Sequence, residues 1–336
     1  MRQHAPVLKR TSKAGARRIR LTWEELRALR QDVLGALRKM GVPNVVGVGI
    51  GYKNALRAQR RKPALIFVVD KKVPDEQLKP RQTLGKRRRM TVRIGAGKSA
   101  RRITLATDVV RRRRVRARPC GAKIVFSGQK GSAGPIVRII GPRDGVRYAV
   151  LTCGHLMFGR SGMELAIERA GRVDATSPAI LHRMTRSDWP YDVNVIELTE
   201  AKLRKLNDTI DPLTAGAKPL GRWLEFSADS EDGRCRTATK GTIPIDIVAA
   251  INKAVYVKGF PRLQDLFFYN AAVRMDEPFT EGISGAAVTS RAEVMIGLHI
   301  AAAENWTLGV GQAIGPMLEW LAEQMGVGTI EVIGYC

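Results

Sequence analysis

Residues 148–155 read Tyr-Ala-Val-Leu-Thr-Cys-Gly-His, an apolar run that ends in a short polar segment closed by His155. Its aromatic and β-branched start is typical of a buried strand. A second strand-like run, residues 193–198, begins directly after Asp192. A third segment, Glu-Gly-Ile-Ser-Gly at residues 281–285, places Ser284 in a glycine-flanked turn. The sequence therefore predicts a histidine, an aspartate and a serine at strand ends within one β-rich region.

These three residue types are the ones that nucleophilic acyl transfer requires. A serine hydroxyl is a weak nucleophile and needs an adjacent base, and histidine is the natural base near neutral pH. A carboxylate on the far ring nitrogen fixes the tautomer and stabilises the imidazolium. Gly282 allows its own N–H and that of Ser284 to point at one position, forming an oxyanion hole. Each motif alone is a weak signal, but together they favour His155 as base, Asp192 as its orienting group and Ser284 as nucleophile.

Residues 120–330 resemble the chymotrypsin/trypsin-like serine peptidases in these segments, which match T-x-x-H, D-[apolar]-x-[apolar]-[apolar]-x-L and G-x-S-G in the same order. The resemblance implies a mainly β fold, a trypsin-like double six-stranded β-barrel with the site between the barrels. It also implies an endopeptidase that hydrolyses protein or peptide substrates through an acyl-enzyme on the serine. No cofactor and no metal are expected.

Ile283 stands where the digestive members of that family carry an aspartate that pairs with a newly cut N-terminus. Because isoleucine cannot form an ion pair, we expect no activation by N-terminal cleavage, as in the HtrA and glutamyl-endopeptidase branches. In addition, Ala286 and Ala287 replace the usual Gly-Pro pair.

Substrate preference is harder to derive from the sequence. Pro278 stands six residues before the serine, where trypsin carries the aspartate that selects basic side chains. His299 lies 15 residues after Ser284, as in glutamyl endopeptidases, where this histidine lines the pocket for Glu or Gln. The threonine expected five residues before the serine is replaced by Phe279. A Glu/Gln preference is one hypothesis, and a structural histidine on a sheet strand is the other. The expected substrate-binding residues are Thr280, His299, Ile300 and Ala301.

The distribution of elements predicts several parts along the chain. Strand-like runs separated by Gly and Pro recur between residues 120 and 300, and a helix is expected at residues 316–325. Near the start, Thr22 and Glu25 form a capping box for a helix that Gly41 ends. We expect a disordered basic tail at residues 1–20, a small N-terminal α+β module at 21–80, a basic connector at 81–118 with strand-like pieces at 91–94 and 103–105, and the peptidase domain at 119–336.

Two strand-like runs follow that first helix, at residues 45–52 and 64–69. Glycines alternate with Val and Ile in the first run, but no helix follows them, so a phosphate-binding turn is not predicted. We expect instead that the bare face of this strand lets the helix pack closely. These runs resemble the leader of poorly characterised bacterial trypsin-like proteins, a likeness that implies no function.

The positive charge of the chain lies in its first part. The net charge is +26, and residues 1–120 hold 34 Lys and Arg against 7 Asp and Glu. Such a segment attracts polyanions, including nucleic acid, anionic membrane surfaces and acidic proteins. Aromatic residues are almost absent near the basic runs, which argues against stacking on bases. Two hypotheses stay open for residues 1–118: a segment that binds a polyanion or protein partner, and a solvated linker. A catalytically inactive or latent module that binds through this region is the alternative to a peptidase.

The remaining bulk features concern compartment and metals. Residues 1–20 lack the apolar core of a secretory signal, and no apolar run approaches the roughly 18 residues of a membrane span. We therefore expect a cytoplasmic protein without a membrane span. The four cysteines show no C-x-x-C spacing and are expected to be free thiols. Cys153 and His155 alone do not supply a zinc site.

Overall fold

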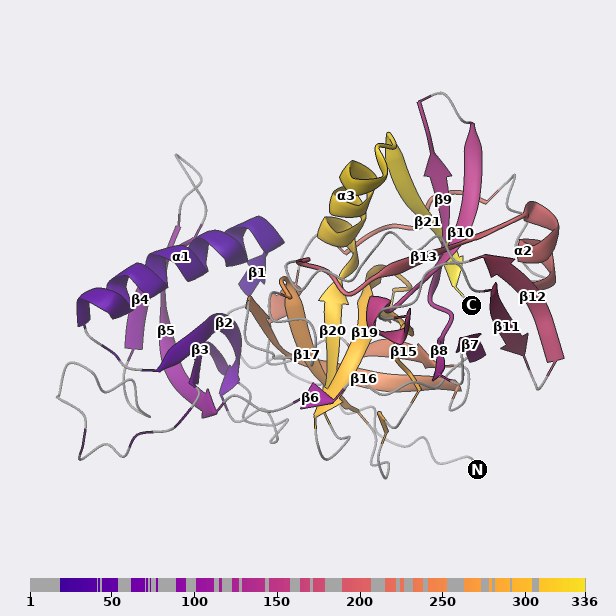
Figure 1. Ribbon diagram of the computed structural model, residues 1–336. Helices are drawn as coiled ribbons and strands as arrows, with labels where there is room; N and C mark the ends of the chain where they lie inside the picture. The colour runs from indigo at the N-terminus through magenta and orange to yellow at the C-terminus, as the bar shows by residue number, and fades with distance from the viewer. Residues whose placement is uncertain are drawn as a thin grey trace, which may run out of the picture.

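The computed structural model describes residues 19–40, 42, 44–53, 62–69, 71, 73, 77, 89–94, 101–111, 115–116, 123–126, 129–142, 145–157, 164–169, 172–178, 189–206, 215–221, 224–226, 232–237, 241–252, 263–272, 278–279, 282–290, 292–303 and 308–335. Strands predominate, and the chain forms an amino-terminal module followed by two β-rich halves (Figure 1). Among these residues, no helix has the length and apolar character that a membrane crossing requires.

The module is built on helix α1 (Trp23–Met40), which lies across four strands (Figure 1). The expected capping box is confirmed, because Glu25 N–H donates to Thr22 Oγ1 at 3.1 Å and Thr22 N–H donates to the Glu25 carboxylate at 2.9 Å. The buried face of α1 packs on the sheet, as the apolar spacing predicts. The strands are β2 (Val45–Lys53), β3 (Lys62–Val69), β4 (Arg89–Ile94) and β5 (Arg101–Arg111).

Strands β4 and β5 lie within residues 81–118, where the sequence predicts a connector. They pair antiparallel with each other, and β5 pairs in parallel with β3, so both belong to the sheet of the module. Val92, Ile103 and Leu105 are buried toward α1, whereas neighbouring arginines on the other face are exposed. The strand-like pieces expected at residues 91–94 and 103–105 thus lie within β4 and β5.

The carboxy-terminal half contains a closed six-stranded antiparallel barrel. Its strands pair in the order β15-β18-β19-β20-β17-β16, and β16 pairs back with β15. The mainly β, barrel-based fold expected from the sequence is therefore confirmed. The strands are β15 (Asp232–Thr237), β16 (Gly241–Asn252), β17 (Leu266–Ala271), β18 (Ala287–Ser290), β19 (Met295–Ala303) and β20 (Leu308–Ala313).

The other half consists of two four-stranded antiparallel sheets. One contains β9 (Pro135–Ile140), β10 (Val146–Thr152), β13 (Asn194–Leu198) and β21 (Thr329–Tyr335). The other contains β7 (Lys123–Phe126), β8 (Gln129–Ser132), β11 (Glu164–Arg169) and β12 (Arg172–Pro178). The short helix α2 (Glu200–Leu206) follows β13. Helix α3 (Ile314–Met325) follows the barrel and leads into β21, so the end of the chain returns to the first half.

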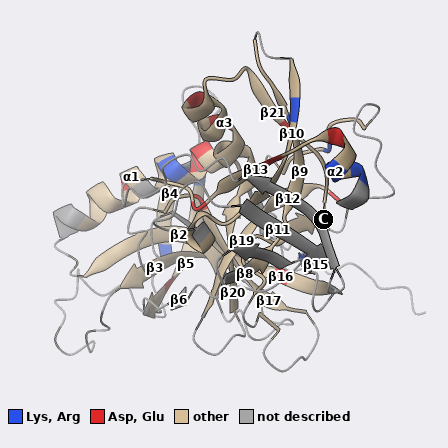
Figure 2. Cartoon of the chain, turned by 45° about the vertical axis from the view of Figure 1, so that its right-hand side comes forward, with Lys and Arg blue, Asp and Glu red and all other residues tan. Residues whose placement is uncertain are grey.

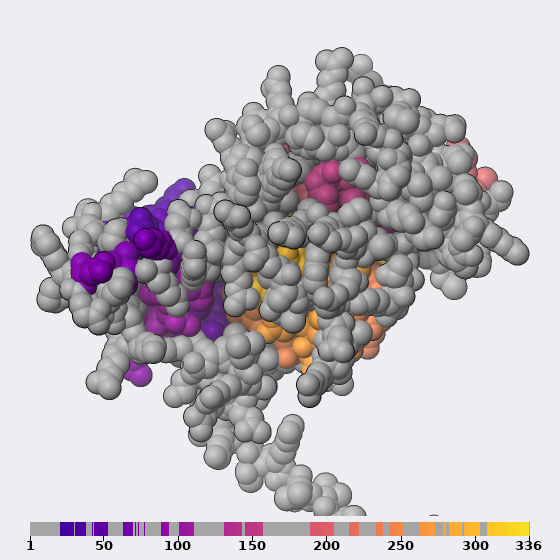
Figure 3. Space-filling model, turned by 60° about the horizontal axis from the view of Figure 1, so that its bottom comes forward, coloured from indigo at the N-terminus to yellow at the C-terminus, as the bar shows by residue number. Residues whose placement is uncertain are grey.

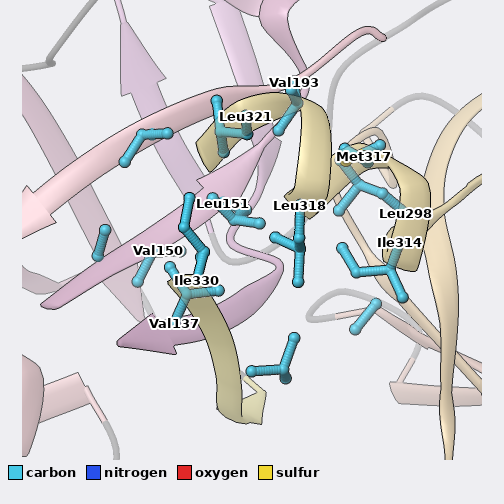
Figure 4. Close-up of a cluster of buried hydrophobic side chains, with 14 of the residues drawn as sticks. Val137, Val150, Leu151, Val193, Leu298, Ile314, Met317, Leu318, Leu321 and Ile330 are labelled. Carbon is cyan, nitrogen blue, oxygen red and sulfur yellow. The ribbon is translucent and has the colours of Figure 1, made fainter. Parts of the chain in front are cut away.

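One apolar core joins the two halves. Leu151 and Val193 from the first half pack with Leu298 of the barrel and with Met317 and Leu318 of α3 (Figure 4). All five are nearly inaccessible to solvent. The burial of this cluster holds the two halves in a fixed relation, because apolar area removed from water is the main favourable term in folding.

The sheet of the module continues into the barrel. Strand β2 pairs antiparallel with β16, from Ala249 opposite Gly51 to Asn252 opposite Val48, and Figure 3 shows the module directly beside the barrel. A Cβ at Gly51 would lie 2.8 Å from Ala249 Cβ. The prediction that the bare face of β2 receives the helix is therefore wrong: Val48 and Ile50 face α1, and Gly51 permits the close approach of β16.

Two short strands, β1 (Ile19–Leu21) and β6 (Val115–Arg116), add pairings to β14 (Leu224–Phe226) and β19.

Candidate active site

His155 and Asp192 lie side by side because their strands are neighbours. His155 lies in a short 3-10 turn (η5, Gly154–Met157) just after β10, and Asp192 lies just before β13, which pairs with β10. Nδ1 of His155 is 2.5 Å from Asp192 Oδ2, and the His155 backbone N–H donates to Oδ1 at 2.8 Å. The Asp192 side chain is fully buried, and 10% of the His155 side chain is exposed. Both carboxylate oxygens of Asp192 thus bind His155, one at its ring and the other at its backbone.

Gln312 on β20 binds the backbone of Asp192. Asp192 N–H donates to Gln312 Oε1 at 2.9 Å, and Gln312 Nε2 donates to the carbonyls of Pro190 and Gln264 at 2.7 and 2.9 Å. Gln312 is fully buried, so every polar atom of its amide needs a partner. Sequence reasoning missed this residue. A glutamine in a strand otherwise made of Leu, Gly, Val and Ala was the available signal.

Ser284 lies in a tight turn that glycine makes feasible. Ala286 N–H donates to the Ile283 carbonyl at 2.9 Å, and Gly285, at the third position of this turn, has a φ of 98°. A positive φ at that position is the signature of a type II turn and is strained for any residue with a Cβ. Gly282 also has a positive φ, of 97°. Ser284 itself is 1% exposed.

The Ser284 turn is clamped against the first half. Ser132, at the end of β8, donates from its N–H to the Ser284 carbonyl at 2.7 Å and from its hydroxyl to the Gly282 carbonyl at 3.1 Å. Thr152 Oγ1 donates to the Ser132 carbonyl at 2.8 Å. A Cβ at Gly285 would lie 2.3 Å from that carbonyl and 2.5 Å from Thr152 Oγ1. The turn is therefore fixed beside the strand end that leads to the histidine.

The second ring nitrogen of His155, Nε2, faces no hydrogen-bond partner among the described residues. Nε2 is buried and has no partner in the part of the chain that the structure describes. The structure thus joins His155 directly to Asp192, whereas Ser284 is brought to this region through the clamp and makes no hydrogen bond to Nε2. Catalytic hydrogen bonds are often long or poorly aligned before substrate binds.

Cys153 lies in the same cluster, since its sulfur and the ligand atoms of His155 and Asp192 all lie within 4.8 Å of one another. Its Sγ donates to the His299 carbonyl at 3.2 Å. Burial, and then the charge of Asp192, raise the pKa of the Cys153 thiol well above its ordinary value. Both a metal ligand and a cysteine nucleophile require the thiolate. The burial of the thiol and the charge of Asp192 therefore disfavour both roles for Cys153.

His299 lies on β19 directly beside the Ser284 turn. Its carbonyl accepts from Gly285 N–H at 2.8 Å, and the side chain is buried. Burial first, and the nearby His155 second, lower the pKa of His299 to about 3, so its ring is neutral at pH 7. Nδ1 is hydrogen-bonded to the Tyr269 hydroxyl, and the ring stacks on Phe279 with centroids 5.9 Å apart.

Two of the other expected substrate-binding residues lie on the same strand as His299. Ile300 and Ala301 are buried on β19, and Ala301 pairs with β20 beyond a register shift. Thr280 lies outside the described residues.

No family model matches the sequence, and no curated protein matches it. Among solved structures, the active form of the Rv3671c protease from M. tuberculosis is 17% identical and covers 58% of this chain and 81% of its own, with a TM-score of 0.34. The chymotrypsin of Cellulomonas bogoriensis is 14% identical over 64% of this chain and 98% of its own, with a TM-score of 0.36. A Glu endopeptidase is 13% identical over 62% and 98%, with a TM-score of 0.29. At such values, the fold and the site rest on the pairings and contacts described above.

Proposed function

We propose that the chain is a serine endopeptidase that forms an acyl-enzyme on Ser284. The observation that carries this proposal is the buried His155–Asp192 pair, whose Nε2 has no partner among the described residues and is available to take a proton. Asp192 accepts from Nδ1–H, so the tautomer with a basic Nε2 is favoured. The roles are then His155 as general base, Asp192 as the carboxylate that orients it, and Ser284 as nucleophile.

The reaction follows acyl-transfer chemistry. The Ser284 hydroxyl attacks the peptide carbonyl while its proton passes to Nε2, and the same proton is then given to the leaving amine. The N–H groups of Gly282 and Ser284 are proposed to stabilise the oxyanion, and the positive φ of Gly282 supports a backbone orientation specific to glycine. Water, activated by His155, then releases the acyl group.

We further propose a preference for Gln or Glu at P1, with Gln favoured. A neutral, buried imidazole at His299 can donate one hydrogen bond but cannot balance the charge of a buried carboxylate. The Tyr269 hydroxyl lies against Nδ1 of His299, and burial raises the pKa of Tyr269, so that the hydroxyl stays protonated. A hydroxyl that donates to Nδ1 favours the His299 tautomer with its proton on Nε2, which can then donate to the substrate. Cleavage of a peptide library should enrich Gln at P1, and His299→Ala should change the preferred residue. An unchanged profile in that variant would assign His299 a structural role.

Labelling with an active-site fluorophosphonate tests the proposed nucleophile. The wild type should be labelled on Ser284, and Ser284→Ala should lose labelling together with peptidase activity, by a factor on the order of 10⁶ in kcat. Cys153→Ser is the matched control and should retain labelling, because its thiol is not the nucleophile. A folded wild type that resists labelling would instead favour a latent or inactive module.

A second candidate function rests on the exposed face of β4 and β5. Arg93 and Arg102 stand directly opposite each other across these strands, and Arg89 is exposed nearby on β4. Like charges facing each other are unfavourable unless an anion neutralises them. This pattern supports binding of a polyanion, such as nucleic acid, by residues 1–118. The logarithm of DNA affinity should then fall with log salt by about 0.9 per phosphate contacted, and a flat response would exclude this function.

A further inference from the structure

We propose that Arg27, on helix α1 of the amino-terminal module, is a positioning residue for the His155–Asp192 pair. The module would then supply part of the framework of the candidate active site, beyond serving as a leader or a docking segment. The inference rests on the proposed function in that it assigns Arg27 a role in the same site. Its geometric basis is a partly buried ion pair between Arg27 and Asp265, whose carboxylate also binds the hydroxyl of Tyr191, the residue preceding Asp192.

The centre of this link is Asp265, just before β17. Its side chain is fully buried and accepts hydrogen bonds from Arg27 Nε at 3.0 Å, Arg27 Nη2 at 2.5 Å and the Tyr191 hydroxyl at 2.6 Å. Its backbone has a φ of 53°, in the left-handed region, which Asp tolerates better than most residues. Two nitrogens of one guanidinium bind this carboxylate, a geometry that lysine cannot reproduce.

The charge of Arg27 is needed at this position. Among the residues that the structure describes, Arg27 is the one cation in contact with the Asp265 carboxylate. Its hydrogen bonds to Asp265 raise the pKa of Arg27, and burial followed by the Asp265 charge raises the pKa of Tyr191. Both groups therefore keep their protons at any pH relevant to activity. Without Arg27, the fully buried Asp265 carboxylate would lack its counter-charge, which is strongly destabilising.

Tyr191 carries the link to the site. Its hydroxyl accepts from Arg27 Nη2 at 3.0 Å and donates to Asp265, and Asp192 is the next residue. Its ring contacts Trp320 of α3, with centroids 5.5 Å apart. A shift of Tyr191 would therefore be transmitted to the carboxylate that orients His155.

The backbone around Tyr191 is part of the same hydrogen-bonded unit. Gln264 N–H donates to the Pro190 carbonyl at 2.9 Å, and Ala313 N–H donates to the Asp265 carbonyl at 2.9 Å. Gln312 in turn accepts from Asp192 N–H. Hydrogen bonds thus join three segments, at 190–192, 264–265 and 312–313. Arg27 binds this unit from the amino-terminal module. In Figure 2, blue for Lys or Arg appears on α1 at its end nearer to α3.

The experiment compares Arg27→Gln, Arg27→Lys and the double variant Arg27→Gln/Asp265→Asn with the wild type. Arg138→Gln is the matched control, because Arg138 is also part-buried and paired, with Glu331 at 2.7 Å, and its side chain hydrogen-bonds Glu331 and the Ala215 carbonyl. Two readouts are taken on chains whose folding is checked by circular dichroism. One is the pH profile of the fluorophosphonate labelling rate, and the other is the NMR resonance of the proton on His155 Nδ1.

Arg27→Gln should slow labelling by on the order of 10- to 100-fold, shift the pH profile and move the Nδ1 proton resonance. Arg27→Lys should give a smaller change of the same kind. The double variant should recover part of the loss because the unpaired carboxylate is gone. Arg138→Gln should match the wild type in both readouts.

Wild-type rates, pH profile and resonance in a folded Arg27→Gln chain would overturn the inference while leaving the proposed function intact. If Arg27→Gln does not fold, the same comparison with Arg27→Lys decides, and an unchanged resonance there overturns the inference. If the wild type itself is not labelled, the proposed function fails. The Nδ1 resonance then still tests whether Arg27 positions the pair.

Discussion

His299 is neutral because the protein offers no compensation for its charge. It is enclosed by Tyr269 and Phe279, and burial is the largest cause of its lowered pKa of about 3. Between pH 6.5 and 3 the unfolded chain binds a proton at this residue that the folded chain does not bind. The stability contributed by His299 is therefore present above pH 6.5 and is lost progressively as the pH falls toward 3.

The lowered pKa of His299 predicts that the free energy of unfolding varies with pH because of this one side chain. Between pH 7 and pH 5, the free energy of unfolding should fall by on the order of 2 kcal/mol because of His299. His299→Asn, which cannot gain a proton, should show a correspondingly flatter dependence in urea unfolding. Comparing the two chains cancels the contributions of the other histidines. Equal slopes in both would contradict the neutral, buried state of His299.

At the scale of an element, the turn carrying Ser284 depends on its second glycine. Gly285 combines a φ of 98° with contacts so close that a Cβ would overlap the Ser132 carbonyl and Thr152 Oγ1. The positive φ and the lack of space for a Cβ both favour glycine at this position. Ser132 and Thr152, which leave no space for a Cβ, belong to strands of the first half. The position of Ser284 is thus set by packing between halves as much as by the turn.

Gly285→Ala should therefore lower stability by on the order of 2 to 4 kcal/mol and abolish fluorophosphonate labelling. Gly35→Ala on α1 is the matched control, since nothing lies within 4 Å of a Cβ there. In a helix interior that change should raise stability by about 1 kcal/mol. Chemical unfolding of the two variants measures both effects. A tolerated Gly285→Ala would mean that the turn is not held as tightly as its contacts indicate.

On the scale of the whole molecule, the module and the barrel share one sheet and one core. Besides the β2–β16 pairing, Leu29 and Phe67 of the module lie in the same buried cluster as Phe267 and Tyr269 of the barrel. Such a shared interior couples the folding of the two parts, because neither can bury its apolar face alone.

The full chain should therefore unfold in one transition, with coincident curves from circular dichroism and tryptophan fluorescence. A chain lacking residues 1–118 would expose the edge of β16 together with part of the shared core, and it should aggregate or melt at a lower temperature. Size-exclusion chromatography and thermal unfolding measure this. A monomeric truncated chain with an unchanged Tm would show that the module is a separate domain.

Much of the local structure follows from the sequence. The capping box at Thr22, the strand runs leading to His155 and following Asp192, and the late helix ending at Met325 all depend on residues close in the chain. Hydrophobic period, turn glycines and caps are local signals, and they suffice to predict a mainly β chain with a histidine, an aspartate and a serine at strand ends. The catalytic roles of these residues stay a prediction.

Tertiary structure was needed for everything that depends on contacts far apart in sequence. The sequence predicts strand-like pieces within a basic connector, but only the pairing of β5 with β3, far away in the chain, shows that β4 and β5 belong to the sheet of the module. The role of Gln312 follows from its hydrogen bond to Asp192, 120 residues away, and the role of Arg27 from its hydrogen bonds to Asp265, 238 residues away. A side chain can satisfy a distant buried polar group only after the chain has folded, and no local pattern encodes which group that is.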